Sequence, residues 1–426
     1  MRGVNVLESN TNELADHLFR REAGKMVASL TRFFGSKHLE LAEDVVQDTL
    51  LKAMQEWPFK GIPDNPEAWL HRVARNGVID KLRRDARGLD LLRENAVLLR
   101  SEWTLAATVH SELNASAISD DQLRMFFACC HPSLAPEQQV ALALKTLCGF
   151  GVPEIARAFV TSEETINKRL YRAREAFRAL GQLEIPQGAE LNDRLGSVLS
   201  TIYLLFNEGY NATRHENLIR EDVIEEALRL CQLLLDHPTT QRPEVHALLA
   251  LMIFHAARSE ARIDTDGAIV LLQDQDRSQW DRALIALGNE HLSRASAGEL
   301  FTTYHLEAII ASLHANAITY ASTDWRSITR MYDELFRMKP SPIVALNRAI
   351  AVAEVDGPLR GLDELDRITG LEQQHLFHAV RGDLLQRAGR NREARAAFEH
   401  ALRLTSSPME HELLTRKLQT TEKAGP

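Results

Sequence analysis

The spacing of apolar residues constrains the fold of this chain more than any other feature of its sequence. Apolar side chains recur three and four residues apart along nearly the whole length, as in Ile166, Leu170, Ala173 and Phe177. Strand-like alternation is almost absent. Because a period of about 3.6 residues places these side chains on one helix face, the pattern predicts an all-α protein. A chain of 426 residues exceeds one ordinary core, so several domains are expected.

Breaks rich in proline and glycine divide the chain. They occur at residues 58–66, and they begin again at Ala86, His131 and Ile185. The expected domains are residues 1–90, a linker over 91–120, a second block over 121–182, a helical domain over 190–300 and repeats over 301–420. Residues 1–180 hold 24 basic and 24 acidic residues, whereas the remainder holds 26 basic and 35 acidic residues. This asymmetry indicates a division of labour between the two parts.

The composition excludes several classes of protein. Apolar residues make up 45% and charged residues 26%, as in soluble globular proteins. No apolar run approaches the roughly 18 residues of a membrane span, and the N-terminus lacks the apolar core of a signal peptide, so we expect a cytoplasmic protein without membrane contact. The sequence "CCH" from Cys129 does not suit a metal, because adjacent helical residues diverge by about 100°. We therefore expect four buried thiols, no metal and no cofactor.

A basic helix is expected around Arg72. Leu70, Ala74, Val78 and Leu82 form one stripe, and the opposite arc carries Arg72, Asn76, Asp80 and Arg83. Trp57, Phe59 and Trp69 flank the preceding break. Aromatic rings beside cations suit single-stranded nucleic acid, whose bases stack while its phosphates meet the cations. The alternative is that both tryptophans anchor the core.

A second expected helix, residues 39–54, has apolar groups on more than one side. Asp44, Gln47 and Asp48 lie beside Leu51, which favours docking onto a helix of a partner protein.

The stretch from Val152 to Leu180 has the pattern of a helix-turn-helix. A short helix over 152–159 is followed by a tight turn, with Thr161 as the expected N-cap and Glu164 completing a capping box. The second helix packs through the stripe named above. Its remaining face carries Asn167, Lys168, Arg169, Tyr171, Arg172, Arg174 and Arg178. Such a helix enters the major groove of DNA.

The C-terminal part contains a weak repeat. Ile328, Tyr332 and Leu335 are followed 33 residues later by Gly361, Leu365 and Ile368, and then by Ala394, Phe398 and Ala401. With Gly382 and Gly389, the last unit resembles a tetratricopeptide repeat, which predicts a stacked solenoid.

Three motifs together resemble a bacterial extracytoplasmic-function sigma factor. They are "EDVVQDTLLKAM", "PEAWLHRVARNGVIDKLRRD" and "GFGVPEIARAFVTSEETINKRLYRARE", which resemble regions 2.2, 2.4 and 4.2 within residues 10–182. "IYLLFNEGY" and "YHLEAIIASLHANA" resemble the long extension of a subgroup that ends in tetratricopeptide-like repeats. The resemblance implies a transcription initiation factor that binds core RNA polymerase, recognises promoter DNA and assists strand opening. It implies no enzymatic activity of the factor itself.

The resemblance also implies roles for individual residues. For the −10 strand it implies Phe59, Lys60, Gly61, Trp69, Arg72, Arg75 and Asn76. For the −35 element it implies Asn167, Lys168, Arg169, Tyr171 and Arg172. Asp44, Gln47 and Asp48 match the face that grips the β′ coiled coil of polymerase, and region 4 of such factors meets the β flap.

Two alternatives remain open at this point. A helix-turn-helix activator with a helical sensor domain explains residues 121–182 but leaves the Arg72 helix and the Asp44 patch unused. An interaction scaffold would use the repeats alone. For the sigma factor, we expect an extension that regulates initiation through an intramolecular contact with the sigma domains, and repeats that bind a protein or peptide.

Overall fold

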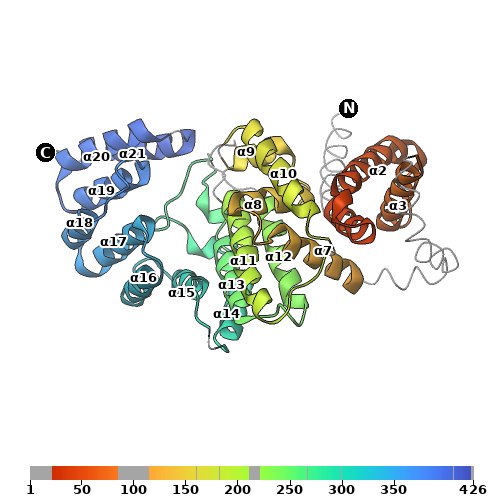
Figure 1. Ribbon diagram of the computed structural model, residues 1–426. Helices are drawn as coiled ribbons and strands as arrows, with labels where there is room; N and C mark the ends of the chain where they lie inside the picture. Colours follow the sequence, from red (N-terminus) through yellow and green to blue (C-terminus); the bar gives the residue numbers. More distant parts are fainter. Residues whose placement is uncertain are drawn as a thin grey trace. The chain divides into compact units, whose positions relative to one another are not determined.

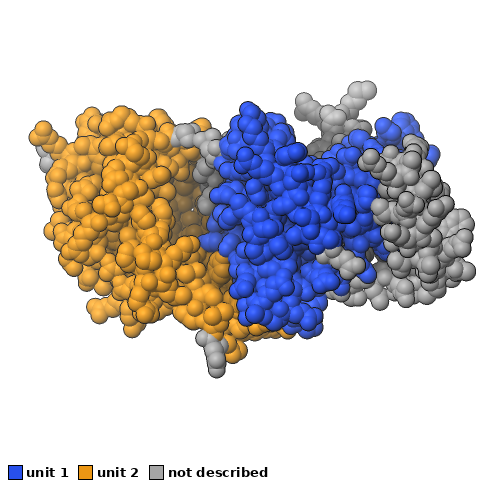
Figure 2. All heavy atoms as spheres, viewed as in Figure 1, with its two compact units in different colours: residues 1–208, 236–240 blue, residues 209–235, 241–426 orange. Residues whose placement is uncertain are grey.

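The computed structural model describes residues 22–84, 115–159, 161–181, 183–210, 221–265, 267–298, 300–405 and 407–423. Throughout these ranges the regular elements are helices, and one isolated antiparallel bridge joins Ile263 and Ile269 (Figure 1). The all-α prediction is confirmed. Most of the expected linker, residues 91–114, lies outside the described residues. Two compact units divide the chain: residues 1–208 with 236–240, and residues 209–235 with 241–426 (Figure 2).

Unit 1 begins with a helix described from residue 22 to residue 34. The elements that follow are η1 (Ser36–His38), α2 (Leu39–Lys60), α3 (Pro66–Arg84), α7 (Ala115–Cys129), α8 (Pro136–Thr146), α9 (Val152–Ala158), α10 (Glu163–Arg178) and α11 (Gly188–Tyr210). Helix α2 packs on α3, and α10 packs on both α8 and α9. The expected short helix and turn before α10 are therefore present.

The break expected from Pro58 begins later in the chain. Helix α2 contains Pro58 in its last turn and ends at Lys60, and Gly61 follows with a φ of 81°. A proline so close to the end removes one hydrogen bond, while Gly61 N–H still donates to the Trp57 carbonyl at 3.0 Å. Phe59 and Lys60 therefore lie in a helix and not in a loop, which corrects the expectation.

Helix α11 belongs with unit 1 as far as Glu208. The Arg194 guanidinium donates to the Phe127 carbonyl in α7 and lies 5.7 Å from the centre of the Phe127 ring. The Thr201 hydroxyl is 3.5 Å from the Cys130 thiol. Helix α11 as far as Glu208 thus packs on α7 within unit 1, and the division between the two compact units follows residue 208.

All four cysteines are free and buried, which confirms the expected buried thiols. Burial raises the pKa of Cys129, Cys130 and Cys231 above the usual range of a thiol. Across the described ranges, no three histidine, cysteine or acidic side chains are grouped so that they could hold a metal ion. None of the helices that the structure describes is long and apolar enough to cross a bilayer.

Unit 2 contains helix α12 (Glu221–Asp236) as far as Leu235, and the helices that follow α12 in the chain. They are α13 (Pro243–Ala256), η2 (Glu260–Arg262), η3 (Arg277–Gln279), α14 (Arg282–Ala295), α15 (Thr303–Asn316), α16 (Trp325–Met338), α17 (Pro342–Asp356), α18 (Pro358–Leu365), α19 (His375–Arg387), α20 (Asn391–Leu404) and α21 (Pro408–Lys423). Helix α13 is buried on nearly all sides and packs on α14 and α15. From α15 onward, each helix contacts the next one along the chain.

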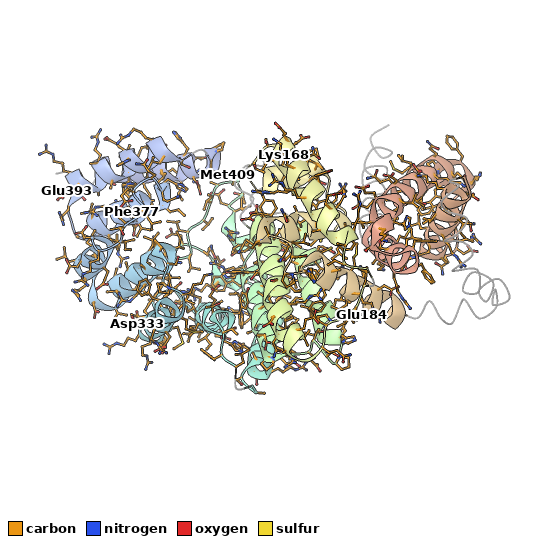
Figure 3. The ribbon with its side chains drawn as sticks, in the orientation of Figure 1. Lys168, Glu184, Asp333, Phe377, Glu393 and Met409 are labelled. Atoms are coloured by element: carbon orange, nitrogen blue, oxygen red, sulfur yellow. The ribbon has the colours of Figure 1, made fainter. Side chains whose placement is uncertain are left out.

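The residues of the three repeat units lie in α16, α18 and α20, except Ile368, which follows the end of α18. Leu335, Gly361, Leu365 and Phe398 are buried, and Figure 3 shows Phe377 among the last hairpins. A Cβ atom on Gly382 would lie 2.6–2.9 Å from the Phe398 ring. Only glycine lets α19 approach α20 this closely, so the contact explains the small and large residues of the pattern.

We predict that Gly382→Ala destabilises unit 2 by about 1–3 kcal/mol, because the added methyl group overlaps a buried aromatic ring. Urea unfolding of the full chain measures the change. The matched control is Gly196→Ala in α11, where the new Cβ has no neighbour within 4 Å. This control should stabilise the protein by about 0.5–1 kcal/mol, since alanine favours an exposed helix. Equal effects of the two substitutions would contradict the packing of α19 on α20.

Candidate nucleic-acid interface

Helix α10 has a solvent-exposed basic face because its apolar stripe is buried. Ile166, Leu170, Ala173 and Phe177 are at most 1% exposed. This burial sets the rotation of the helix about its own axis. It leaves four of the sequence-predicted −35 residues exposed: Asn167, Lys168, Tyr171 and Arg172. Figure 3 shows Lys168 at the outer edge of this domain.

The exposed residues of α10 differ in how their charges are neutralised. Lys168 Nζ lies 2.7 Å from Glu164 Oε1 one turn earlier in the same helix. Among the described residues Arg172 has no ion pair, and Arg169 is half-buried. Tyr171, which has a large aromatic side chain, is 66% exposed. A cation, an amide and an aromatic ring are therefore presented together, as recognition of base edges requires.

The N-cap of α10 lies one residue later than the sequence suggested. Ser162 is the N-cap, and its hydroxyl accepts a hydrogen bond from the Thr165 N–H at 3.2 Å. Thr161 was the wrong choice, and Glu164 does not complete a capping box. Serine and threonine are both favoured N-caps, with serine somewhat better, so two adjacent candidates differ only slightly in local preference. The correction leaves Glu164 free to pair with Lys168.

Helix α3 has the same one-sided construction. Leu70, Ala74 and Val78 are at most 1% exposed, whereas Arg72 and Asn76 face solvent. Arg75 is half-buried. The side chains of Leu82, Arg83 and Arg84 lie outside the described residues. Of the predicted polar arc, Arg72, Asn76 and Asp80 are exposed.

Aromatic residues lie at the end of α2 and in the first turn of α3. Trp57 and Trp69 are both half-buried and meet edge to face, with their ring centres 5.6 Å apart. The Phe59 ring is 89% exposed at the end of α2. Lys60 lies beside it with Nζ 2.9 Å from Glu56 Oε2, and Gly61 is exposed where the loop begins. The structure therefore brings a free ring, a pair of packed rings and two exposed polar groups of α3 into one small domain.

The outer face of α2 combines acidic and apolar groups. Asp44, Gln47 and Asp48 are exposed, and Leu51 and Met54 on the same helix are 55% and 56% exposed. The inner face packs so closely on α3 that a Cβ atom at Gly77 would lie 2.9 Å from Val45 Cγ1. Asp48 Oδ2 is 2.8 Å from Lys81 Nζ, so one predicted docking carboxylate is already paired with α3.

The sequence did not identify the partners in the ion pairs between distant segments of unit 1. Arg174 of α10 lies 2.6 Å from Glu43 of α2, and Asp121 of α7 lies 2.9 Å from Arg32. Both carboxylates are buried. One feature of the sequence indicates a buried ion pair: Glu43 is an acidic residue between Ala42 and Val45, which are both buried. The identity of its partner depends on tertiary structure.

Family models match three parts of the chain. "Sigma-70 region 2" matches residues 18–88, and "Sigma-70, region 4" matches residues 127–177. The "Family of unknown function (DUF6596)" matches residues 194–296. No solved structure matches the chain.

Several curated proteins are similar in sequence. An uncharacterized protein of Rhizobium meliloti is 38% identical over 386 residues, which cover 90% of each chain. The ECF RNA polymerase sigma factor SigG of Mycobacterium tuberculosis is 29% identical over 227 residues, covering 49% of this chain and 59% of SigG. The ECF RNA polymerase sigma factor SigL of the same species is 32% identical over 138 residues, covering 32% of this chain and 72% of SigL.

A helix-turn-helix with an exposed basic face and a second domain with aromatic and basic groups define a transcription initiation module. The chain belongs to the extracytoplasmic-function (ECF) sigma factor family, with a C-terminal extension of unknown function. It is a non-enzymatic factor that binds core RNA polymerase and recognises promoter DNA. This result favours the sigma factor over the activator and the scaffold.

The corrected N-cap gives a stability prediction. Ser162→Ala should destabilise α10 by about 0.5–2 kcal/mol, because the Thr165 N–H loses its acceptor. Thr161→Ala, one residue earlier, is the matched control and should change the free energy of unfolding by less than about 0.5 kcal/mol. Thermal unfolding followed by circular dichroism measures both. A larger loss in the Thr161 variant would restore the original N-cap.

Proposed function

We propose that promoter recognition and polymerase binding are divided among three surfaces of unit 1. The exposed face of α10 reads the −35 duplex. A set of residues on α2, α3 and the loop between them captures the unpaired −10 strand. This α2–α3 group consists of Phe59, Lys60, Gly61, Trp69, Arg72, Arg75 and Asn76. The outer face of α2 binds the β′ coiled coil of polymerase, and region 4 binds the β flap. The observation that carries the proposal is the exposure of Asn167, Lys168, Tyr171 and Arg172 opposite a fully buried stripe.

The chemistry of α10 supports direct reading of bases. An arginine can donate two hydrogen bonds to guanine, an asparagine can pair with adenine, and an aromatic ring can contact the thymine methyl group. Arg169, which is half-buried, is assigned to the phosphates. Because the N-terminal half of a recognition helix lies deepest in the groove, residues 167–172 are suitably placed along the helix.

The α2–α3 group supports capture of single-stranded DNA. Phe59 offers a free stacking surface, and Lys60, Arg72 and Arg75 supply positive charge for the backbone. Trp69 has one side packed against Trp57, and Asn76 can hydrogen-bond to an unpaired base. Gly61 lets the chain turn away without covering the ring, because its positive φ suits glycine.

The extension is proposed to regulate initiation. The stack of helices from α15 to α21, with its Gly382–Phe398 contact, supports a tetratricopeptide-like solenoid that would present a surface to a protein or peptide. The excess of acidic residues after residue 180 disfavours nucleic acid as its ligand. An intramolecular contact with the sigma domains would let the extension replace a separate regulatory protein.

Promoter reading by α10 gives the first functional prediction. Arg172→Ala should weaken binding of promoter duplex by about 1–3 kcal/mol and relax preference at one position. Lys168→Ala should have the same effect if Lys168 contacts a base. If Lys168 contacts phosphate, the substitution should weaken binding to all duplex sequences alike. Selection from a duplex library measures both effects, and core polymerase binding should not change. Asp48→Asn is the converse control, since it should weaken polymerase binding alone.

Strand capture gives the second functional prediction. Trp69→Ala and Asn76→Ala should leave the closed promoter complex nearly intact but impair opening, because stacking and base capture act only on unpaired DNA. Permanganate reactivity of unpaired thymines reports opening directly. Trp57→Phe is the control, since it keeps an aromatic ring against Trp69. Normal opening in both variants, or unfolding of the Trp69 variant, would assign Trp69 to the core alone.

Regulation by the extension gives the third functional prediction. A protein that ends after Tyr210 should transcribe from a cognate promoter at a rate different from that of the full chain, higher if the extension inhibits and lower if it assists. Run-off transcription with core polymerase measures the rate. The chain must not be cut near residue 185, because α11 covers α7 through Arg194 and Thr201. Equal rates, with equal polymerase binding, would contradict a regulatory extension.

A further inference from the structure

Two arginines of α10 form ion pairs with glutamates of α2. Arg174 Nη2 lies 2.6 Å from Glu43 Oε2, and Arg178 Nη2 lies 2.6 Å from Glu40 Oε2. The arginines are four residues apart on one helix, and the glutamates are three residues apart on the other. Each pair therefore follows one helix face, so the two ion pairs form a row between α10 and α2.

The inner ion pair is incompletely satisfied. The Glu43 side chain is 10% exposed and the Arg174 side chain is 21% exposed. Glu43 Oε1 and Arg174 Nε are buried and have no hydrogen-bond partner among the residues that the structure describes. Burial raises the pKa of Glu43, although Arg174 and Lys145 nearby act in the opposite direction. Moving two charges out of water costs free energy, and this cost offsets much of their attraction in a buried ion pair. Separating Arg174 from Glu43 therefore costs little free energy if water or new partners then solvate both groups.

The outer ion pair is shared. Arg178 also contacts Glu175 in its own helix, and its backbone carbonyl accepts a hydrogen bond from the Ser36 hydroxyl at 3.3 Å. Glu175 would stay beside Arg178 if α2 moved away, whereas Glu40 would not. Removal of α2 would therefore free Arg174 fully and Arg178 in part.

The position of these arginines along α10 suits contact with the DNA backbone. Arg174 and Arg178 follow Arg172 by about 3 Å and about 9 Å of helix rise. A recognition helix reads bases with its N-terminal half, and phosphates flank the groove beyond that half. Guanidinium groups bind carboxylate and phosphate oxygens with the same forked geometry. Glu43 and Glu40 thus present to α10 the kind of oxygen that DNA would present.

We propose that Glu40 and Glu43 act as an internal substitute for DNA phosphates, and that Arg174 and Arg178 bind the duplex backbone once α2 separates from α10. The inference rests on the proposed −35 role of α10. Its consequence is a link between the two halves of the sigma module: α2, which carries the proposed polymerase face, also competes with DNA for α10. Polymerase that draws α2 away would release cations for the promoter.

The salt dependence of DNA binding tests this competition. The full chain and its Glu40→Gln/Glu43→Gln variant are titrated with a labelled mixed-sequence duplex at several salt concentrations. Each phosphate contact adds about 0.9 to the slope of log affinity against log salt. We expect the variant to bind more tightly and its slope to be steeper by about 1 to 2, since Arg178 keeps Glu175.

Two further proteins separate this effect from general loss of negative charge. Glu67→Gln/Glu137→Gln removes two exposed carboxylates that form no ion pair among the described residues, and its slope should equal that of the wild type. Adding Arg174→Gln and Arg178→Gln to the first variant should return its slope to the wild-type value. Unchanged slope in a folded Glu40→Gln/Glu43→Gln protein would overturn the proposal.

The −35 role of α10 is tested separately by titrating Arg172→Ala and the wild type with a cognate promoter duplex. Weaker binding of Arg172→Ala together with an unchanged slope in the glutamate variant rejects the competition alone. Unchanged binding of Arg172→Ala rejects the −35 role of α10, and the competition with it.

Discussion

Burial of one apolar face on each helix is the constraint on which the functional surfaces depend. Val45 in α2, Ala74 in α3 and Leu170 in α10 are each 1% exposed. Since a helix rotated about its axis would bring polar groups into the core, these stripes determine which side chains meet solvent. Asp44, Arg72 and Arg172 are therefore exposed to solvent. Their identities can change without a change of fold, which suits factors that must differ in promoter choice.

The stripes and the residues opposite them could be predicted from sequence because they follow from local periodicity. The exposed positions of α3 and α10 were found in this way, as was the Gly382–Phe398 pattern. Helix ends were predicted less well. Pro58 was expected to end α2, yet a proline in a last turn costs only one hydrogen bond. Thr161 and Ser162 are both good caps, so a shift of one residue leaves hardly any local signal.

Contacts between distant segments could not be predicted for a different reason. Glu43 and Arg174 are 131 residues apart, and nothing in either local pattern selects the other. The same holds for Arg194, whose guanidinium reaches the Phe127 carbonyl and thereby joins α11 to region 4. Composition indicated a break near residue 185, but the boundary depends on which surface α11 covers. Domain limits in such a chain are properties of packing, and charge or proline content alone does not give them.

The buried cysteines have a practical meaning for chemistry in solution. A thiolate is the species that reacts with oxidants and alkylating reagents, and burial disfavours it at Cys129, Cys130 and Cys231. The folded protein should therefore be nearly inert toward maleimides and peroxide, and Cys129 and Cys130 should become reactive only when α7 separates from its neighbours. The native thiols can thus serve as reporters of opening in unit 1. A cysteine introduced on the surface could be labelled without removing any of them.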